Sequence, residues 1–157
     1  MPFTPFHFGP GLLIQSAARR QFSLVAFITA QVLIDLEPGL NLLRHHHPVH
    51  GALHTYLGSL ILVPVAALVA RAWNRIFRKS PRRFSSLLIS GWVGVWSHVL
   101  LDSLIHRDIV PFLPFSSSNP FYGAISYRDV YVGCSIAGIA GAAMWLWLRA
   151  PAPPPAR

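Results

Sequence analysis

The stretch GWVGVWSHVLLD, residues 91–102, carries both the fold and the chemistry of this sequence. It lies in an apolar run from Phe84 to Ile105, which matches the ~20 residues that a helix needs to cross a bilayer. His98 and Asp102 are four residues apart, so on an α-helix they share one face. Ionisable groups inside a span are costly unless they are paired or bound to metal. The stretch therefore predicts a membrane helix that contributes to a polar site.

The composition of the whole chain agrees with a membrane protein. Of the 157 residues, 53% are hydrophobic and only 11% are charged, whereas soluble domains have about 25% charged residues. The net charge of +8 does not indicate nucleic-acid binding, because the basic residues stand between apolar runs. The single Cys134 excludes an intramolecular disulfide and a cysteine-only zinc cluster. We expect one transmembrane domain over residues 1–149 and a disordered, proline-rich tail over 150–157.

Apolar runs outline the helices. Three are long enough to span a bilayer: Leu53–Trp73, Phe84–Ile105 and Val130–Leu148. A shorter run, Phe22–Leu36, should end at Pro38–Gly39, which disfavour helix continuation. A fifth piece, Pro10–Ala18, is predicted to be a short span or a half-helix packed on the others. The sequence thus predicts an all-α integral membrane bundle of four to five helices.

The basic residues predict the orientation of the bundle. One short loop between two spans is strongly basic and should face the cytoplasm. Alternating the spans from that loop places ten basic residues on its side: Arg19, Arg20, Arg71, Arg75, Arg78, Lys79, Arg82, Arg83, Arg149 and Arg157. Only Arg44, Arg107 and Arg128 fall on the other side. We therefore expect a protein of a bacterial-type inner membrane.

All five carboxylates and all eight histidines fall at the predicted non-cytoplasmic end. Several lie in or beside apolar spans, on four separate segments. His50 and His54 have the same four-residue spacing, at the start of the span Leu53–Trp73. Asp35 lies at the end of the run Phe22–Leu36, and His7 lies just before the N-terminal piece. The candidate metal ligands are His7, Asp35, His50, His54, His98 and Asp102.

The donor types indicate which ion would bind. Imidazole and carboxylate without thiolate suit zinc best, with manganese, iron or another divalent ion as alternatives. Six ligands are enough for two ions, and we expect one to three. His45–His47 is interpreted as a solvated loop. His106 is expected to support the ligands, and Asp108 and Asp129 to cap or flank helices.

The ordered set resembles a known family. An N-terminal His7, then Asp35 with Glu37, then His50 with His54–Thr55, and finally His98 with Asp102 is similar to the pattern of small membrane-bound metal-dependent hydrolases. That family is thought to be distantly similar to zinc-dependent phospholipase C. The resemblance covers about the first hundred residues and implies a helical fold with a metal cluster and hydrolase activity. The chain departs from the pattern where Glu37–Pro38 replaces an acidic residue and a histidine.

The preferred hypothesis is a metal-dependent hydrolase that acts on a phosphoester or a lipid headgroup at the outer membrane face. Asp35 or Glu37 would be the general base, and Arg44, Arg107 and Arg128 would bind phosphate. The expected partners are membrane lipid and a phosphate-containing substrate, with no nucleic acid. One alternative is a metal-binding or transport protein without hydrolysis. Another is a structural or interaction protein whose polar cluster holds helices together, and haem binding by paired histidines is a weaker third.

Overall fold

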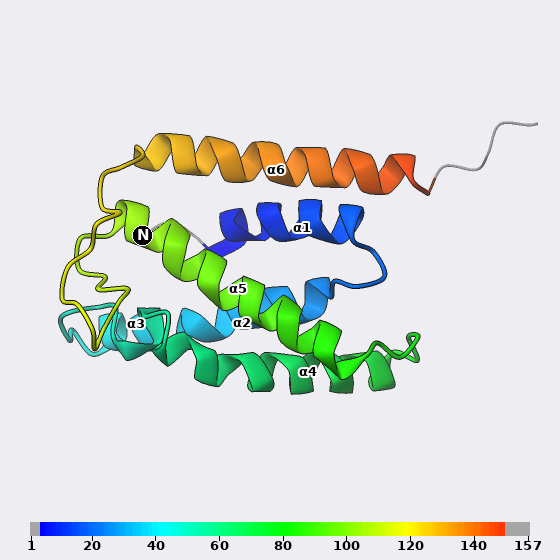
Figure 1. The fold of residues 1–157 in the computed structure, drawn as a ribbon, viewed down its shortest axis with the longest axis horizontal. Coiled ribbons are helices and arrows are strands. Elements are labelled where there is room, and N and C mark those ends of the chain that lie inside the picture. Colours follow the sequence, from blue (N-terminus) through cyan, green and yellow to red (C-terminus); the bar gives the residue numbers. More distant parts are fainter. Residues whose placement is uncertain (1–3, 150–157) are drawn as a thin grey trace, which may run out of the picture.

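The computed structural model describes residues 4–149, which fold into helices without any strand in that range. The α-helices are α1 (Phe8–Ala17), α2 (Leu24–Ile34), α3 (Leu36–Leu43), α4 (Leu62–Ile76), α5 (Phe84–Ile105) and α6 (Tyr127–Trp147). Short 3-10 helices are η1 (Thr4–His7), η2 (Ala52–His54) and η3 (Gly58–Ile61). Figure 1 shows α6 beside α1, α4 beside α2, and α5 running obliquely between these pairs, with helix ends toward two opposite poles. The predicted all-α bundle is confirmed, while the predicted tail at 150–157 lies outside the described residues.

Four helical stretches are long and apolar enough to cross a membrane: Leu24–Leu43, Gly58–Ile76, Phe84–Ile105 and Tyr127–Trp147. Their outward faces carry large apolar side chains that the protein itself leaves uncovered. On α6, for example, Ile136 is 61% exposed and Ile139 is 71% exposed. Hydrocarbon rather than water is the solvent that suits such faces.

The prediction that the second span ends at Pro38–Gly39 is wrong. The α2 helix stops at Ile34, Asp35 forms the junction, and α3 continues through both residues to Leu43. Pro38 is tolerated because it stands in the first turn of α3, where a backbone N–H has no partner within the helix. The break at Asp35 leaves that carboxylate at the meeting point of two helices.

The start of the next span also differs from the prediction. His50 lies in an irregular bend and His54 ends η2, so the two histidines do not share an α-helical face. Residues 52–61 form η2 and η3, and α4 begins only at Leu62. The rings of His50 and His54 nevertheless lie 4.8 Å apart, because the compact 3-10 path folds the segment back on itself.

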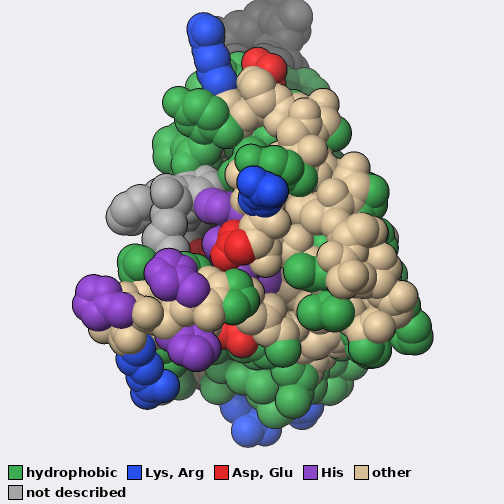
Figure 2. Space-filling view, turned by 90° about the vertical axis from the view of Figure 1, so that its left-hand side faces the viewer, with side chains coloured by type: hydrophobic (Ala, Val, Ile, Leu, Met, Phe, Trp, Pro, Cys, Tyr) green, Lys and Arg blue, Asp and Glu red, His purple; other side chains and the backbone are tan. Residues whose placement is uncertain are grey.

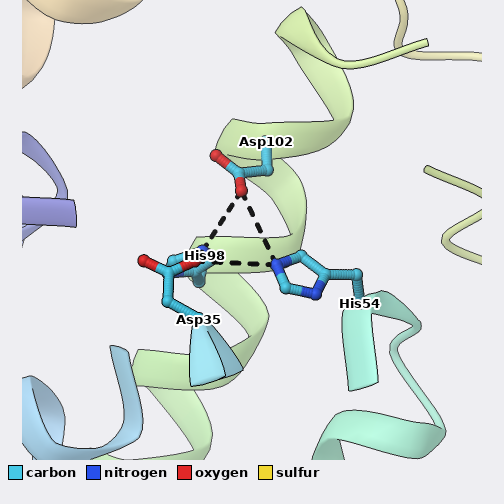
Figure 3. Close-up of side chains that lie close together, drawn as sticks. All are labelled: Asp35, His54, His98 and Asp102. Carbon is cyan, nitrogen blue, oxygen red and sulfur yellow. Dashed lines mark ion pairs between the residues drawn. The ribbon is translucent and has the colours of Figure 1, made fainter. Parts of the chain in front are cut away.

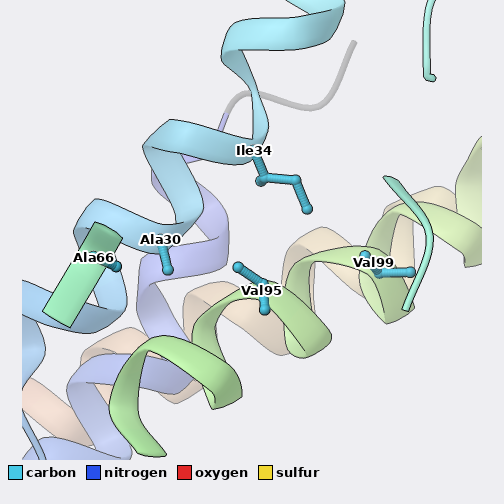
Figure 4. Close-up of a cluster of buried hydrophobic side chains, with 5 residues drawn as sticks. All are labelled: Ala30, Ile34, Ala66, Val95 and Val99. Carbon is cyan, nitrogen blue, oxygen red and sulfur yellow. The ribbon is translucent and has the colours of Figure 1, made fainter. Parts of the chain in front are cut away.

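Three helices form the principal core. Small side chains of α2 and α4 allow the helices to approach, and Val95 and Val99 of α5 fill the space between them (Figure 4). Ala30, Ile34 and Ala66 complete this cluster, and each member is fully buried. The core positions the C-terminal halves of α2 and α5 side by side, so Asp35 faces the His98–Asp102 face of α5.

The remaining helices, α1 and α6, pack mainly on each other. Their backbones approach closely at Gly141, whose carbonyl oxygen accepts a hydrogen bond of 2.8 Å from the Ser16 hydroxyl. This contact uses the small residues expected at a membrane helix interface. It holds α1 in place, and with it His7 at the end of η1.

The two poles differ in charge. Histidine and acidic side chains gather at the pole where α3 and α5 end, which Figure 2 views directly. The opposite pole contains the basic turn between α4 and α5, with Arg78, Lys79, Arg82 and Arg83. The predicted segregation of acids and histidines from this turn is therefore present in the fold.

The close approach of α1 and α6 predicts a large difference between two glycines of α6. A Cβ at Gly141 would lie 2.6 Å from the Leu13 backbone nitrogen, whereas one at Gly133 would meet nothing within 4 Å. We expect Gly141→Ala to destabilise the protein by about 1–3 kcal/mol through overpacking. Thermal unfolding in detergent measures the effect, with Gly133→Ala as the matched control. Equal midpoints for the two variants would contradict the packing described.

Candidate metal centre

Four donor side chains from three segments converge at the acidic pole (Figure 3). His98 Nε2 lies 3.1 Å from Asp35 Oδ1 and 3.2 Å from Asp102 Oδ2. His54 Nε2 lies 3.7 Å from Asp102 Oδ2 and 3.9 Å from Asp35 Oδ1. Donor atoms bound to one ion at about 2.1 Å lie about 3–4 Å apart, so these four already have a suitable spacing.

The local structure explains the convergence. His98 and Asp102 stand one turn apart on α5, and Asp35 occupies the α2–α3 junction. His54 is brought over them by the 3-10 segment that precedes α4. His98, His54 and Asp102 are almost fully buried, while the Asp35 side chain remains 30% exposed. Asp35 is thus the most exposed member of the cluster.

Several buried polar atoms of this cluster lack a hydrogen bond among the described residues. They are Nδ1 of His7, both ring nitrogens of His54, Nε2 of His98 and Oδ1 of Asp102. The carboxylate contacts of His98 are at ion-pair distance but not in hydrogen-bond geometry. Unsatisfied polar groups at such depth are expensive, and their concentration at one point fits a site for a cation.

A relay of hydrogen bonds orients His98. The Ser97 hydroxyl donates to the Gly94 carbonyl and accepts 3.3 Å from Gln31 Nε2, which leaves the Gln31 carbonyl oxygen to face His98. His98 Nδ1 donates to that oxygen, at 2.5 Å. His98 Nε2 therefore points at two carboxylate oxygens, and only a proton or a metal ion between them makes this arrangement favourable.

Gln31 was missed by the sequence analysis. In the sequence, its only signal is an amide four residues before Asp35 in a run where Thr29 is the other polar residue. In the fold Gln31 is fully buried, on the same face of α2 as Asp35. A buried ligand histidine that donates its second N–H to a neighbouring carbonyl is the usual supporting contact of metal sites.

A second donor group adjoins the first and shares Asp102 with it. His50, Asp102 and His106 have donor atoms within 4.8 Å of one another. Asp108 accepts from His50 Nδ1 at 2.9 Å and from the His50 backbone N–H at 3.2 Å. His106 was expected only to support the ligands, but it lies at ligand spacing, while Asp108 orients His50. The carboxylate of Asp102 can bridge the two groups.

His7 approaches from the N-terminal side. Its Nε2 lies 3.5 Å from Asp102 Oδ1, and its ring meets that of His98 edge-on at 4.7 Å. Burial, assisted by the neighbouring His98, lowers the pKa of His7 to about 4. Burial also lowers the pKa of His54 and of His106. These imidazoles are therefore neutral near pH 7, which is the form that binds metal.

Glu37 has a different environment from the other carboxylates. Its Oε2 accepts a 2.9 Å hydrogen bond from the Leu53 backbone N–H and lies 3.9 Å from His54 Nδ1. A Cβ at Gly51 would be only 2.4 Å from Glu37 Oε1, so the segment fits tightly over this carboxylate. These contacts suit a residue that fixes the segment from Gly51 to Leu53 and thereby positions His54.

The three arginines proposed for phosphate binding surround the pole without entering the cluster. Arg44 is the C-cap of α3, Arg107 follows α5, and Arg128 lies in the first turn of α6. All three side chains are exposed. They can contribute positive potential at the mouth of the site, and none contacts a member of the cluster among the described residues.

Comparison with known protein families identifies a relationship over most of the chain. A family model described as YdjM inner membrane protein matches residues 7–152, which is most of the chain and includes every donor described above. No curated protein and no solved structure matches.

The contacts of Glu37 predict that it orders the loop before α4. Glu37→Ala removes the acceptor of the Leu53 N–H, and we expect a cost of about 1 kcal/mol because a part-buried donor loses its hydrogen bond. Hydrogen exchange at the Leu53 amide should accelerate accordingly. Glu37→Gln keeps an acceptor oxygen and is the matched control. If Leu53 exchanges equally slowly in Glu37→Ala, the positioning role of Glu37 is wrong.

Proposed function

The chain belongs to the YdjM inner membrane protein family, and on that premise we propose that it is a membrane-embedded, metal-dependent hydrolase of phosphoesters. The single observation that carries the proposal is the convergence of Asp35, His54, His98 and Asp102, in which Nε2 of both histidines is buried and makes no hydrogen bond among the described residues. A structural polar cluster would satisfy these atoms with one another. A site built for a cation leaves them aimed at a common point.

Zinc is the proposed ion, since the donors are imidazoles and carboxylates; manganese and iron use the same donors. Of the one to three ions expected, the two donor groups support one or two. Asp35, His54, His98 and Asp102 would hold the first ion, and His50, Asp102 and His106 the second. When bound, such ions supply Lewis-acid activation of water and of a phosphoryl oxygen.

The protein's own groups account for the rest of the chemistry. Asp35, the most exposed carboxylate of the four-donor cluster, is placed to accept a proton from the attacking water at Oδ1 or Oδ2. Gln31 and Ser97 keep His98 in one orientation, and Glu37 keeps His54 over the site. Glu37 is the weaker candidate for general base, because Oε2 is already occupied by the Leu53 N–H. Arg44, Arg107 and Arg128 would attract the phosphate.

We further propose that this site faces the non-cytoplasmic side of the inner membrane. The support is the distribution of basic residues, which concentrate in the turn at the opposite pole. Basic loops remain on the cytoplasmic side during insertion.

Metal analysis and turnover together test the proposal. We expect the purified full-length chain to bind zinc and to hydrolyse bis(4-nitrophenyl) phosphate in a chelator-sensitive manner. His98→Ala should lower both zinc affinity and turnover by more than about 100-fold, because removing a ligand costs more than removing its supporting residue. His47→Ala, in the exposed loop, is the control that should change neither.

The outcomes separate the proposal from its alternatives. Zinc binding without turnover of any phosphoester, soluble or lipid, would favour the metal-binding or transport alternative. Equal zinc content in His98→Ala and the native chain would refute the centre itself. A thermal stability unaffected by metal removal would favour a purely structural cluster.

The relay through Gln31 generates a separate prediction. Gln31→Leu removes the acceptor of His98 Nδ1 and should weaken zinc binding by about 10–100-fold, the usual effect of losing such a support. Gln31→Glu retains an acceptor and should restore most of the affinity. Competition with a chromogenic chelator measures both constants. Unchanged affinity in Gln31→Leu would show that the relay does not orient the ligand.

A further inference from the structure

A large apolar groove runs along the outer half of α5. Its volume is about 720 Å³, within the range of small-molecule sites in proteins. Trp92, Trp96 and Leu100 form its floor, since they follow one another at intervals of one helical turn. Leu60 of η3 and Phe112 in the loop after α5 also line it.

The lining identifies the kind of molecule that fits. The groove has no charged residue, and two of its few polar groups are already used within the protein. The Ser97 hydroxyl donates to Gly94, and the Trp96 indole N–H donates to the Tyr56 carbonyl at 3.1 Å. The groove lies beside a membrane span, so hydrocarbon rather than water is available to fill it. An alkyl chain matches this lining, whereas a sugar or a charged peptide does not.

The groove and the metal centre share their supporting segments. His54 precedes the groove residue Tyr56 by two positions, and Asp108 precedes Pro111 by three. The two segments are joined directly, because the Tyr56 backbone N–H donates to the Pro111 carbonyl at 2.9 Å. Ser97 makes a third link, since it lines the groove and belongs to the relay that ends at His98.

The geometry also shows how one ligand could reach both places. Trp96 and Leu100 are each two residues from a donor, His98 and Asp102, so groove and cluster occupy opposite sides of α5. The helix ends at Ile105, about 7–8 Å along its axis from Leu100. A headgroup can therefore pass over this end, where Arg107 is exposed.

From these contacts we infer that the groove holds the hydrocarbon chain of a membrane phospholipid whose phosphoester headgroup bends over the end of α5 to the metal centre. The inference rests on the proposed hydrolase function and names its substrate class. A phospholipid is the ligand that combines an alkyl chain with a phosphate. Phe115, which is 85% exposed at the groove, would contact the same lipid at the membrane surface.

Photo-crosslinking tests the occupant independently of turnover. The full chain is placed in nanodiscs of phosphatidylglycerol that contains a diazirine in one acyl chain, and labelled residues are mapped by mass spectrometry. We expect Trp96 and Phe112 to be labelled several-fold more than Ile136 and Ile139, which face outward on α6. Equal labelling of the two sets would mean that only unspecific surrounding lipid is present and would overturn the inference.

A groove-filling variant tests the link to the reaction. Leu100→Trp should lower the turnover of phosphatidylglycerol about tenfold more than that of bis(4-nitrophenyl) phosphate, which has no chain to accommodate. The matched control, Ile139→Trp on α6, should affect neither. An equal loss for both substrates would refute a role for the groove in substrate binding.

Failure of the inferred phospholipid substrate can be distinguished from failure of the proposed hydrolase function. Turnover of the soluble diester without any turnover of phospholipid would overturn the inferred substrate and leave the hydrolase intact. Selective labelling of the groove without turnover of either substrate would overturn the hydrolase and the substrate role together, while the lipid site itself would stand.

Discussion

The structure depends on a pair of carboxylates that are held against imidazole nitrogens in a medium with little water. Asp35 and Asp102 both approach His98 Nε2, while Gln31 occupies the other nitrogen of the same ring. In a low dielectric this geometry is unfavourable unless positive charge lies between the acceptors. The α2–α4–α5 core supplies the rigidity that keeps the groups together, and lipid around the bundle leaves few alternative partners.

Much of the fold follows from apolar runs of membrane length. Those runs predicted the helices at Phe84–Ile105 and near Val130–Leu148, because a span needs a minimum length whatever its packing. The predicted helix bounds were wrong where local backbone geometry, rather than hydrophobicity, determines the structure. Pro38 was interpreted as a helix end, yet it stands in the first turn of a new helix, where it costs little. The 3-10 path of residues 52–61 has no distinctive pattern, so the apolar run was extended through it.

The candidate site was partly predictable for a related reason. Ionisable residues in apolar runs are rare enough to be informative, so the six proposed ligands could be selected one by one, and the fold places them at one pole. Gln31 and His106 could not be assigned in that way. An amide in a span carries no charge to attract attention, and the position of His106 depends on how the chain turns after α5.

The order of the donors along the chain has a consequence for truncation. Every donor of the centre lies before residue 109, and α6 begins only at Tyr127. A chain that stopped before Tyr127 would therefore still contain the whole ligand set, although α1 would lack the helix on which it mainly packs.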